Sequence, residues 1–162
     1  MADDPGARTS FEPTIWYLSF RQTTPVWWVR LLARGRFQHV SAFGWVPDTR
    51  LWLFYDVGLY RTQVYALPDG PLAHERIEAL HRDAAVVAFT PRGERSRWVR
   101  LGFWCCPAIA HLIGLRAFPL RPDAMFRAVL REGGALCGAQ AEEPGDVPDH
   151  GHDLRRQWSG AC

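Results

Sequence analysis

The sequence has 162 residues, of which 48% are apolar and 13% aromatic, enough to build the core of one domain. Its formal net charge is only +2 at pH 7 and its arginines are scattered along the chain, so no nucleic-acid partner is expected. The longest apolar run, residues 101–115, is interrupted by Pro107 and His111 and is too short for a membrane span.

The two ends of the chain differ in composition from its middle. Residues 1–13 are expected to form a flexible leader, and their polar, acidic start does not resemble a signal peptide. Adjacent cysteines such as Cys105 and Cys106 rarely bridge each other, so we expect reduced thiols and a cytoplasmic location. Residues 138–162 are rich in Gly, Pro, Asp and Glu and are expected to form a disordered tail. A single α+β domain is therefore expected over residues 14–137.

Between these ends, turn residues separate segments of alternating and of helical apolar spacing. The first expected helix covers residues 26–33, opened by Thr24 and Pro25 and stopped by Arg34 and Gly35. Strands are expected over residues 37–46, 50–57, 61–66 and 84–90, and a further strand over residues 96–103 that pairs with the last of these. Helices are expected over residues 72–82, 105–115 and 124–132, the last two ended by Gly114 and by Gly133 and Gly134. The order indicates an α+β fold in which a small antiparallel sheet packs against helices.

Two polar residues oppose each other in the first predicted hairpin. If Pro47 and Asp48 are its two turn residues, partners are those whose numbers sum to 95, and His39 and Asp56 are such a pair. The Asp56 carboxylate can then accept the imidazole Nδ1–H and leave Nε2 free to act as a base. The alternative is a satisfied structural pair, and a one-residue slip would put the two side chains on opposite faces. The same register predicts three further pairs: Ser41 with Phe54, Phe43 with Trp52, and Trp45 with Arg50 in a cation–π contact.

The Cys105–Cys106 pair lies where a helix is expected to begin. Pro107 is tolerated only in a first turn, so it places the helix start within a residue or two of the cysteines. The helix dipole and a neighbouring imidazolium both favour a thiolate, and N–H groups at the helix start can stabilise an oxyanion. The stripe expected to be buried consists of Ile109, Leu112 and Ile113. Cys105 lies nearer the centre of this stripe, so it is the expected nucleophile and Cys106 the alternative; equally, both can be small buried hydrophobes.

Several segments in this order resemble one family. They are residues 26–30, 35–39 and 52–56, Cys105 with residues 112–115, and Pro122 before the last helix. Together they resemble small phage- and prophage-encoded proteins that are similar to circularly permuted papain-like hydrolases of the NlpC type. In that arrangement a His strand and a strand with a polar residue precede the Cys helix. The resemblance covers residues 24–132 and implies Cys105 as nucleophile, His39 as base and Asp56 as the residue that orients the base.

The resemblance implies a cysteine peptidase or amidase that cleaves an amide or peptide bond, with a cell-wall peptide or another acyl compound as substrate and no cofactor. Permuted members of the superfamily also include acyltransferases. A different class is a catalytically silent structural or accessory protein of a phage or gene-transfer particle, in which exposed tryptophans contact structural partners. The tryptophans considered for that interface are Trp16, Trp27, Trp28 and Trp104. No metal is expected, because adjacent cysteines make poor tetrahedral ligands and His111, His150 and His152 do not complete a separated pair.

Overall fold

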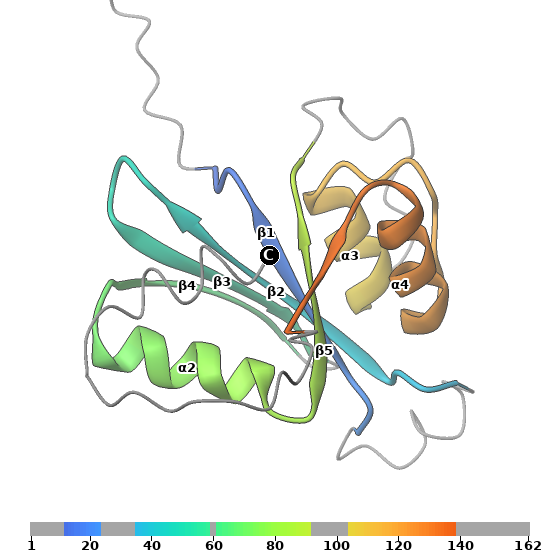
Figure 1. Ribbon diagram of the computed structural model, residues 1–162, viewed down its shortest axis with the longest axis horizontal. Helices are drawn as coiled ribbons and strands as arrows, with labels where there is room; N and C mark the ends of the chain where they lie inside the picture. The colour runs from blue at the N-terminus through green and yellow to red at the C-terminus, as the bar shows by residue number, and fades with distance from the viewer. Residues whose placement is uncertain (1–11, 24–34, 59–60, 92–103, 139–162) are drawn as a thin grey trace, which may run out of the picture.

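The computed structural model describes residues 12–23, 35–58, 61–91 and 104–138 (Figure 1). The helix predicted over residues 26–33, the strand predicted over residues 96–103, residues 1–11 of the leader and residues 139–162 of the tail lie outside these ranges. In the described residues, an antiparallel sheet has the strand order β4-β3-β2-β1-β5-β6, and three helices pack against it. The elements in chain order are β1 (Trp16–Arg21), β2 (His39–Val46), β3 (Leu51–Val57), β4 (Thr62–Pro68), α2 (Pro71–His81), β5 (Ala84–Phe89), α3 (Cys105–Leu112), α4 (Pro122–Arg131) and β6 (Ala135–Cys137). The expectation of an α+β fold with a small antiparallel sheet is confirmed.

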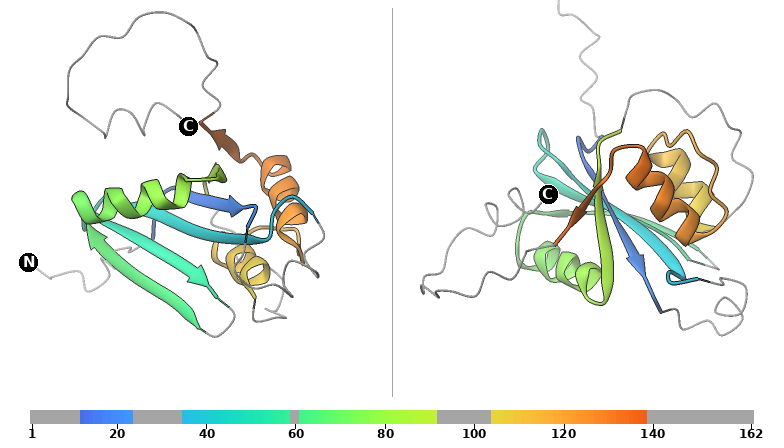
Figure 2. Two further views of the ribbon diagram at one scale, coloured as in Figure 1. Left: turned by 90° about the horizontal axis from the view of Figure 1, so that it is seen from below. Right: turned by 45° about the vertical axis from the view of Figure 1, so that its right-hand side comes forward.

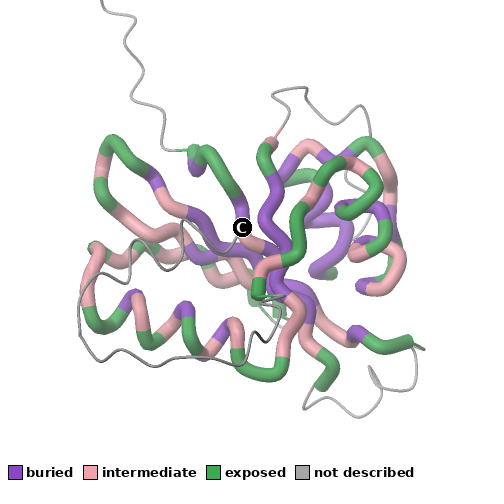
Figure 3. Tube along the Cα trace, viewed as in Figure 1, coloured by how far each residue is buried: buried purple, intermediate pink, exposed green. Residues whose placement is uncertain are grey.

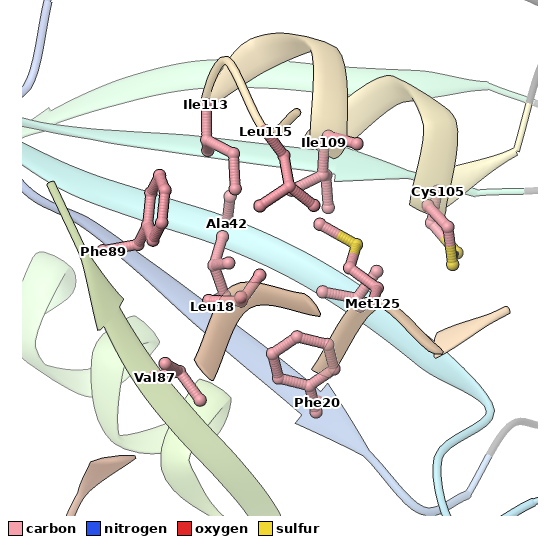
Figure 4. Packing of buried hydrophobic residues seen from close by; sticks show 14 of the residues in the cluster. Leu18, Phe20, Ala42, Val87, Phe89, Cys105, Ile109, Ile113, Leu115 and Met125 are labelled. Carbon is pink, nitrogen blue, oxygen red and sulfur yellow. Dashed lines mark hydrogen bonds between the residues drawn. The ribbon is translucent and has the colours of Figure 1, made fainter. Parts of the chain in front are cut away.

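The helices cover both faces of the sheet, with α2 on one face and α3 with α4 on the other (Figure 2). Alternate residues of β1 therefore enter two separate cores, as expected for a strand that is buried on both faces. Leu18 and Phe20 pack with Ile109 and Met125 beneath α3 and α4 (Figure 4). On the opposite face, a second cluster forms under α2 around Phe43, Phe54, Ile77, Leu80 and Val86. Figure 3 shows that burial is concentrated where these two cores meet the central strands.

The strand β1 was not predicted from the sequence, although it occupies the centre of the sheet. It pairs antiparallel with β2 on one side and with β5 on the other. Its apolar residues Trp16, Leu18 and Phe20 are buried, which is the alternation of a strand, but no turn motif marks its start. The short strand β6, which pairs with β5, was also not predicted.

The hairpin of β2 and β3 has a different register from the predicted one. Pro47 to Arg50 form a four-residue turn, closed by a hydrogen bond from the Arg50 N–H to the Pro47 carbonyl oxygen at 3.2 Å. Arg50 has a φ of 54° and belongs to this turn rather than to the strand. The observed pairs include Phe43 with Phe54 and Trp45 with Trp52, so the predicted register and the three further pairs predicted from it are wrong.

The register error has a limited consequence because its size is two residues. Side chains alternate between the two faces of a strand, so a shift by an even number keeps every residue on its predicted face. Trp45 lies against the ring of Trp52, with centroids 5.3 Å apart, in place of the predicted cation–π contact with Arg50. Asp56, one position beyond the pair Ala42 and Tyr55, is on the same face as His39, displaced diagonally from it.

The helix α3 begins at Cys105, as the position of Pro107 predicts. It ends at Leu112, three residues earlier than expected, and Gly114 follows with a φ of 68°. Ile109 and Ile113 are fully buried as predicted, but Leu112 is exposed, and the burial of α3 extends over all of residues 105–110 rather than along one stripe. Within the ranges that the structure describes, no helix has both the length and the apolar character needed to cross a membrane.

Candidate functional site

His39 and Asp56 form a close pair at one end of the β2–β3 hairpin. The His39 Nε2 atom lies 2.7 Å from Oδ1 of Asp56, a distance typical of a charge-assisted hydrogen bond. Both side chains remain partly accessible, at 22% for His39 and 27% for Asp56. The prediction that the two residues meet is confirmed, but they meet diagonally, and the ring uses Nε2 where Nδ1 was expected. The Nδ1 atom is therefore the ring nitrogen left for a third group.

That third group is the thiol of Cys105, the first residue of α3. The helix α3 packs against β2, so its first turn lies over the start of that strand. The His39 side chain and the backbone of Val40, the next residue of β2, lie close enough to the Cys105 thiol to lower its pKa. Figure 4 shows Cys105 at the start of α3, at the margin of the apolar core that contains Ile109 and Ile113. His39 is thus placed between a carboxylate and a thiol that are far apart in the sequence.

This position changes the pKa values of His39 and Asp56. Burial is the largest influence on His39 and lowers its pKa, but hydrogen bonds with Asp56 and Cys105, together with their charges, outweigh it and raise the pKa to about 9. Burial likewise acts to raise the pKa of Asp56. The His39 hydrogen bond and the positive charges of His39, Arg21 and Arg76 outweigh burial, so that the pKa lies below its ordinary value. The pair is therefore charged over the neutral pH range.

The two adjacent cysteines differ in environment. A hydrogen bond from Cys106 is the largest influence on Cys105 and lowers its pKa; burial opposes this, and the interactions with His39 and Val40 assist it, giving about 4. The hydrogen bond with Cys105, burial and the charges of Cys105 and Asp123 all raise the pKa of Cys106. Cys106 is fully buried, whereas 8% of Cys105 is exposed. Cys105 is accordingly the thiolate that faces His39, and Cys106 is a protonated thiol that donates to it.

A further residue at the site, Asp123, was not identified from the sequence as more than part of a helix start. It lies in the first turn of α4, and its carboxylate accepts the backbone N–H groups of Arg36 at 3.0 Å and Phe37 at 3.3 Å. Gly35, with a φ of 154°, is packed so closely that a Cβ atom there would lie 2.0 Å from Oδ2 of Asp123. These residues lead directly into His39, so the carboxylate anchors the chain just before the site.

Three other histidines belong to the described residues, and His150 and His152 lie outside them. His111, near the end of α3, is exposed. His74 pairs with Asp69, with Nε2 and Oδ1 3.0 Å apart, and His81 packs edge-on against Phe43. Among the residues that the structure describes, no group of three or more His, Cys, Asp or Glu side chains is arranged to hold a metal ion.

The tryptophans considered for a partner interface fall into three groups. Trp16 is buried in the core, so it is not available on the surface. Trp104, the residue before Cys105, is 46% exposed, and its Nε1–H donates to the carbonyl oxygen of Leu120 at 3.1 Å. Trp27 and Trp28 lie outside the described residues.

Comparison of the chain with protein-family models, with curated protein sequences and with solved structures gives no match.

Proposed function

We propose that this protein is a thiol hydrolase that cleaves an amide or related acyl bond, with Cys105 as nucleophile, His39 as acid and base, and Asp56 as the residue that orients His39. One observation carries the proposal: the His39 imidazole is hydrogen-bonded to the Asp56 carboxylate, and it lies close enough to the Cys105 thiol that each of these two groups shifts the pKa of the other. A nucleophile, a base and a group that holds the base are the components of nucleophilic catalysis by cysteine.

The first half of the reaction uses the charged pair. The Cys105 thiolate attacks the acyl carbon and forms a C–S bond, and negative charge develops on the carbonyl oxygen. Pro107 has no N–H, and the Ala108 N–H is directed at the Trp104 carbonyl oxygen at 3.4 Å, so the backbone N–H groups of Cys105 and Cys106 are the donors at the start of α3 that would face this charge. The protonated His39 gives its Nδ1 proton to the leaving amine as the C–N bond breaks.

The second half releases the acyl group. Neutral His39 removes a proton from a water molecule, and the resulting hydroxide attacks the thioester carbon. The C–S bond then breaks and Cys105 leaves as the thiolate, while His39 is again protonated. Asp56 holds the ring in one orientation through both halves, because its hydrogen bond occupies Nε2. An acyltransferase would follow the same course with another nucleophile in place of water.

The order of the residues along the chain supports the papain-like interpretation. A His strand, a strand with a polar residue and then a Cys helix are the arrangement implied by the resemblance to permuted NlpC-type hydrolases, and His39, Asp56 and Cys105 occupy β2, β3 and the start of α3. We propose a peptide of the cell-wall kind as the natural substrate class on this resemblance.

The test is acylation of the protein by p-nitrophenyl acetate, monitored by mass spectrometry of the intact chain. The pH is set between the pKa of Cys105, about 4, and the pKa of His39, about 9. Wild-type protein should release a burst of one equivalent of p-nitrophenolate followed by slower continued release, and acid-quenched samples should carry one acetyl group on Cys105. Cys105→Ala should lose the adduct, and His39→Gln should slow acylation by about 10²–10⁴-fold. The matched control is His74→Gln, which breaks the His74–Asp69 pair away from the cysteines and should leave the rate unchanged. Equal acylation of wild type, His39→Gln and Cys105→Ala would overturn the proposal.

A further inference from the structure

We propose that Cys105 and Cys106 form a redox site, in which a hydroperoxide oxidises Cys105 and Cys106 then closes a disulfide between the two adjacent residues. The proposal does not depend on hydrolase activity. It requires only a reactive outer thiol, a second thiol within reach, and a backbone that can rearrange locally.

The two thiols differ in their distance from the surface, with Cys105 nearer to solvent and Cys106 deeper in the core. Both are free, and their Sγ atoms are 3.9 Å apart. Cys105 is the outer thiol with a small exposed area, whereas Cys106 has none. An oxidant from solution therefore reaches Cys105 first, while the buried Cys106 is protected from oxidants and from other thiols. Once Cys105 is oxidised, the Cys106 thiol lies 3.9 Å from it.

Bond formation requires the sulfurs to approach from 3.9 Å to about 2.05 Å, which distorts the peptide that joins the two residues. The first turn of α3 can yield at low cost. Amide groups in a first turn have no partner within the helix, Pro107 has no N–H at all, and the bond from Ala108 to Trp104 is long at 3.4 Å. Unwinding this turn gives up the long hydrogen bond between Ala108 and Trp104, and the fully buried Ile109 and Ile113 continue to hold the rest of the helix.

The chemistry proceeds in two balanced steps. The Cys105 thiolate attacks the hydroperoxide; an S–O bond forms, the O–O bond breaks, and the leaving oxygen is protonated to water or an alcohol. The sulfur is oxidised by two electrons to a sulfenic acid and the peroxide is reduced by two. The Cys106 sulfur then attacks the Cys105 sulfur; an S–S bond forms, the S–O bond breaks, and the hydroxyl leaves with the Cys106 proton as water.

Oxidation of Cys105 in the first step favours the attack by Cys106 in the second step. The hydrogen bond with the Cys105 thiolate and its negative charge both raise the pKa of Cys106 in the reduced chain. Oxidation converts that thiolate to a neutral sulfenic acid, so both influences are removed when Cys106 has to lose its proton. The product protects Cys105 from irreversible oxidation and is reversed by a dithiol reductant. It also removes the thiolate on which the proposed hydrolase activity depends.

The experiment treats the reduced full-length chain with one equivalent of hydrogen peroxide and then with an alkylating reagent. The tryptic peptide between Arg100 and Arg116 contains both cysteines and is analysed by mass spectrometry. In the wild type this peptide should lose two hydrogen atoms, resist alkylation, and accept two alkyl groups after reduction with dithiothreitol. In Cys106→Ser the sulfenic acid of Cys105 should accumulate and be trapped by dimedone.

Two results would overturn the proposal. One is a wild-type peptide that gains oxygen atoms at the same rate as the Cys106→Ser peptide, since Cys106 would then play no part. The other is a wild-type peptide that stays fully alkylatable after peroxide treatment. The second of these results is measured on the wild-type chain alone, so it does not depend on whether Cys106→Ser folds. Acylation by p-nitrophenyl acetate of the reduced chain is scored separately, so failure of the redox site and failure of the hydrolase are distinguished.

Discussion

The carboxylate of Asp123 joins the start of α4 to the residues that enter β2, and its removal should destabilise both the fold and the site. The informative substitution is Asp123→Ala, which deletes the acceptor of the Arg36 and Phe37 N–H groups. Asp123→Asn is the conservative variant, because it keeps one oxygen acceptor and removes the charge.

The expected loss follows from the surroundings of each bond. The Phe37 N–H is partly buried, and leaving it without a charged partner costs about 1.5–3 kcal/mol, whereas the exposed Arg36 N–H regains water and costs little. The carboxylate also lies in the first turn of α4, where a negative charge stabilises a helix by about 0.3–1 kcal/mol. Asp123→Ala should therefore lose about 2–4 kcal/mol of unfolding free energy, and Asp123→Asn about half of that.

Urea denaturation of wild type and variants measures this loss, with Asp48→Asn as the control. Asp48 is an exposed aspartate in the Pro47–Arg50 turn, so its substitution should change stability by less than about 0.5 kcal/mol. A second readout is the rate of Cys105 alkylation as a function of pH. If Asp123 positions His39, the midpoint of that profile should rise in Asp123→Ala. A variant as stable as Asp48→Asn, with an unchanged alkylation profile, would refute the anchoring role.

Two further predictions concern a close backbone contact and the response to pH. In Gly44→Ala the new Cβ would lie 2.6 Å from Cβ of Pro13, so the free energy of unfolding measured by urea denaturation should fall by about 1–3 kcal/mol. The control is Gly70→Ala, where the nearest atom is 3.9 Å away and the change in stability should be close to zero. Equal losses of stability in the two variants would contradict the close contact at Gly44. The pKa of Cys105 is lowered from 9.0 to about 4, so the contribution of its thiolate to stability is complete above pH 9 and is lost as the pH falls to 4. The pKa of His39 is raised from 6.5 to about 9, so the contribution of its imidazolium is complete below pH 6.5 and is lost as the pH rises to 9. Because the two effects oppose each other between pH 6.5 and 9, the unfolding free energy should rise from about pH 4 to 6.5 and then level off, and a continued rise to pH 9 in a denaturation series would contradict the assignment.

Local signals in the sequence determined much of the secondary structure and the composition of the site. Alternating apolar residues predicted β2 to β5 within a few residues, and Pro107 placed the start of α3 because proline is compatible only with a first turn. The partnership of His39 and Asp56 was predictable although the register was wrong. A turn lengthened by two residues preserves the face of every side chain, so the two residues still meet.

Only the tertiary structure decided the features that depend on residues far apart in the chain. The central place of β1 follows from its pairing with β2 and β5, and no local pattern encodes strand order. The distinction between Cys105 and Cys106 depends on which thiol faces His39 across the packed interface of α3 and β2. If α3 were shifted by one residue along its sequence, Cys106 would occupy the position next to His39 instead of Cys105. The role of Asp123 likewise arises where α4 meets the segment before β2, 86 and 87 residues away in sequence. Sequence periodicity reports which face of an element is apolar, but only packing determines which polar groups on two such elements come into contact.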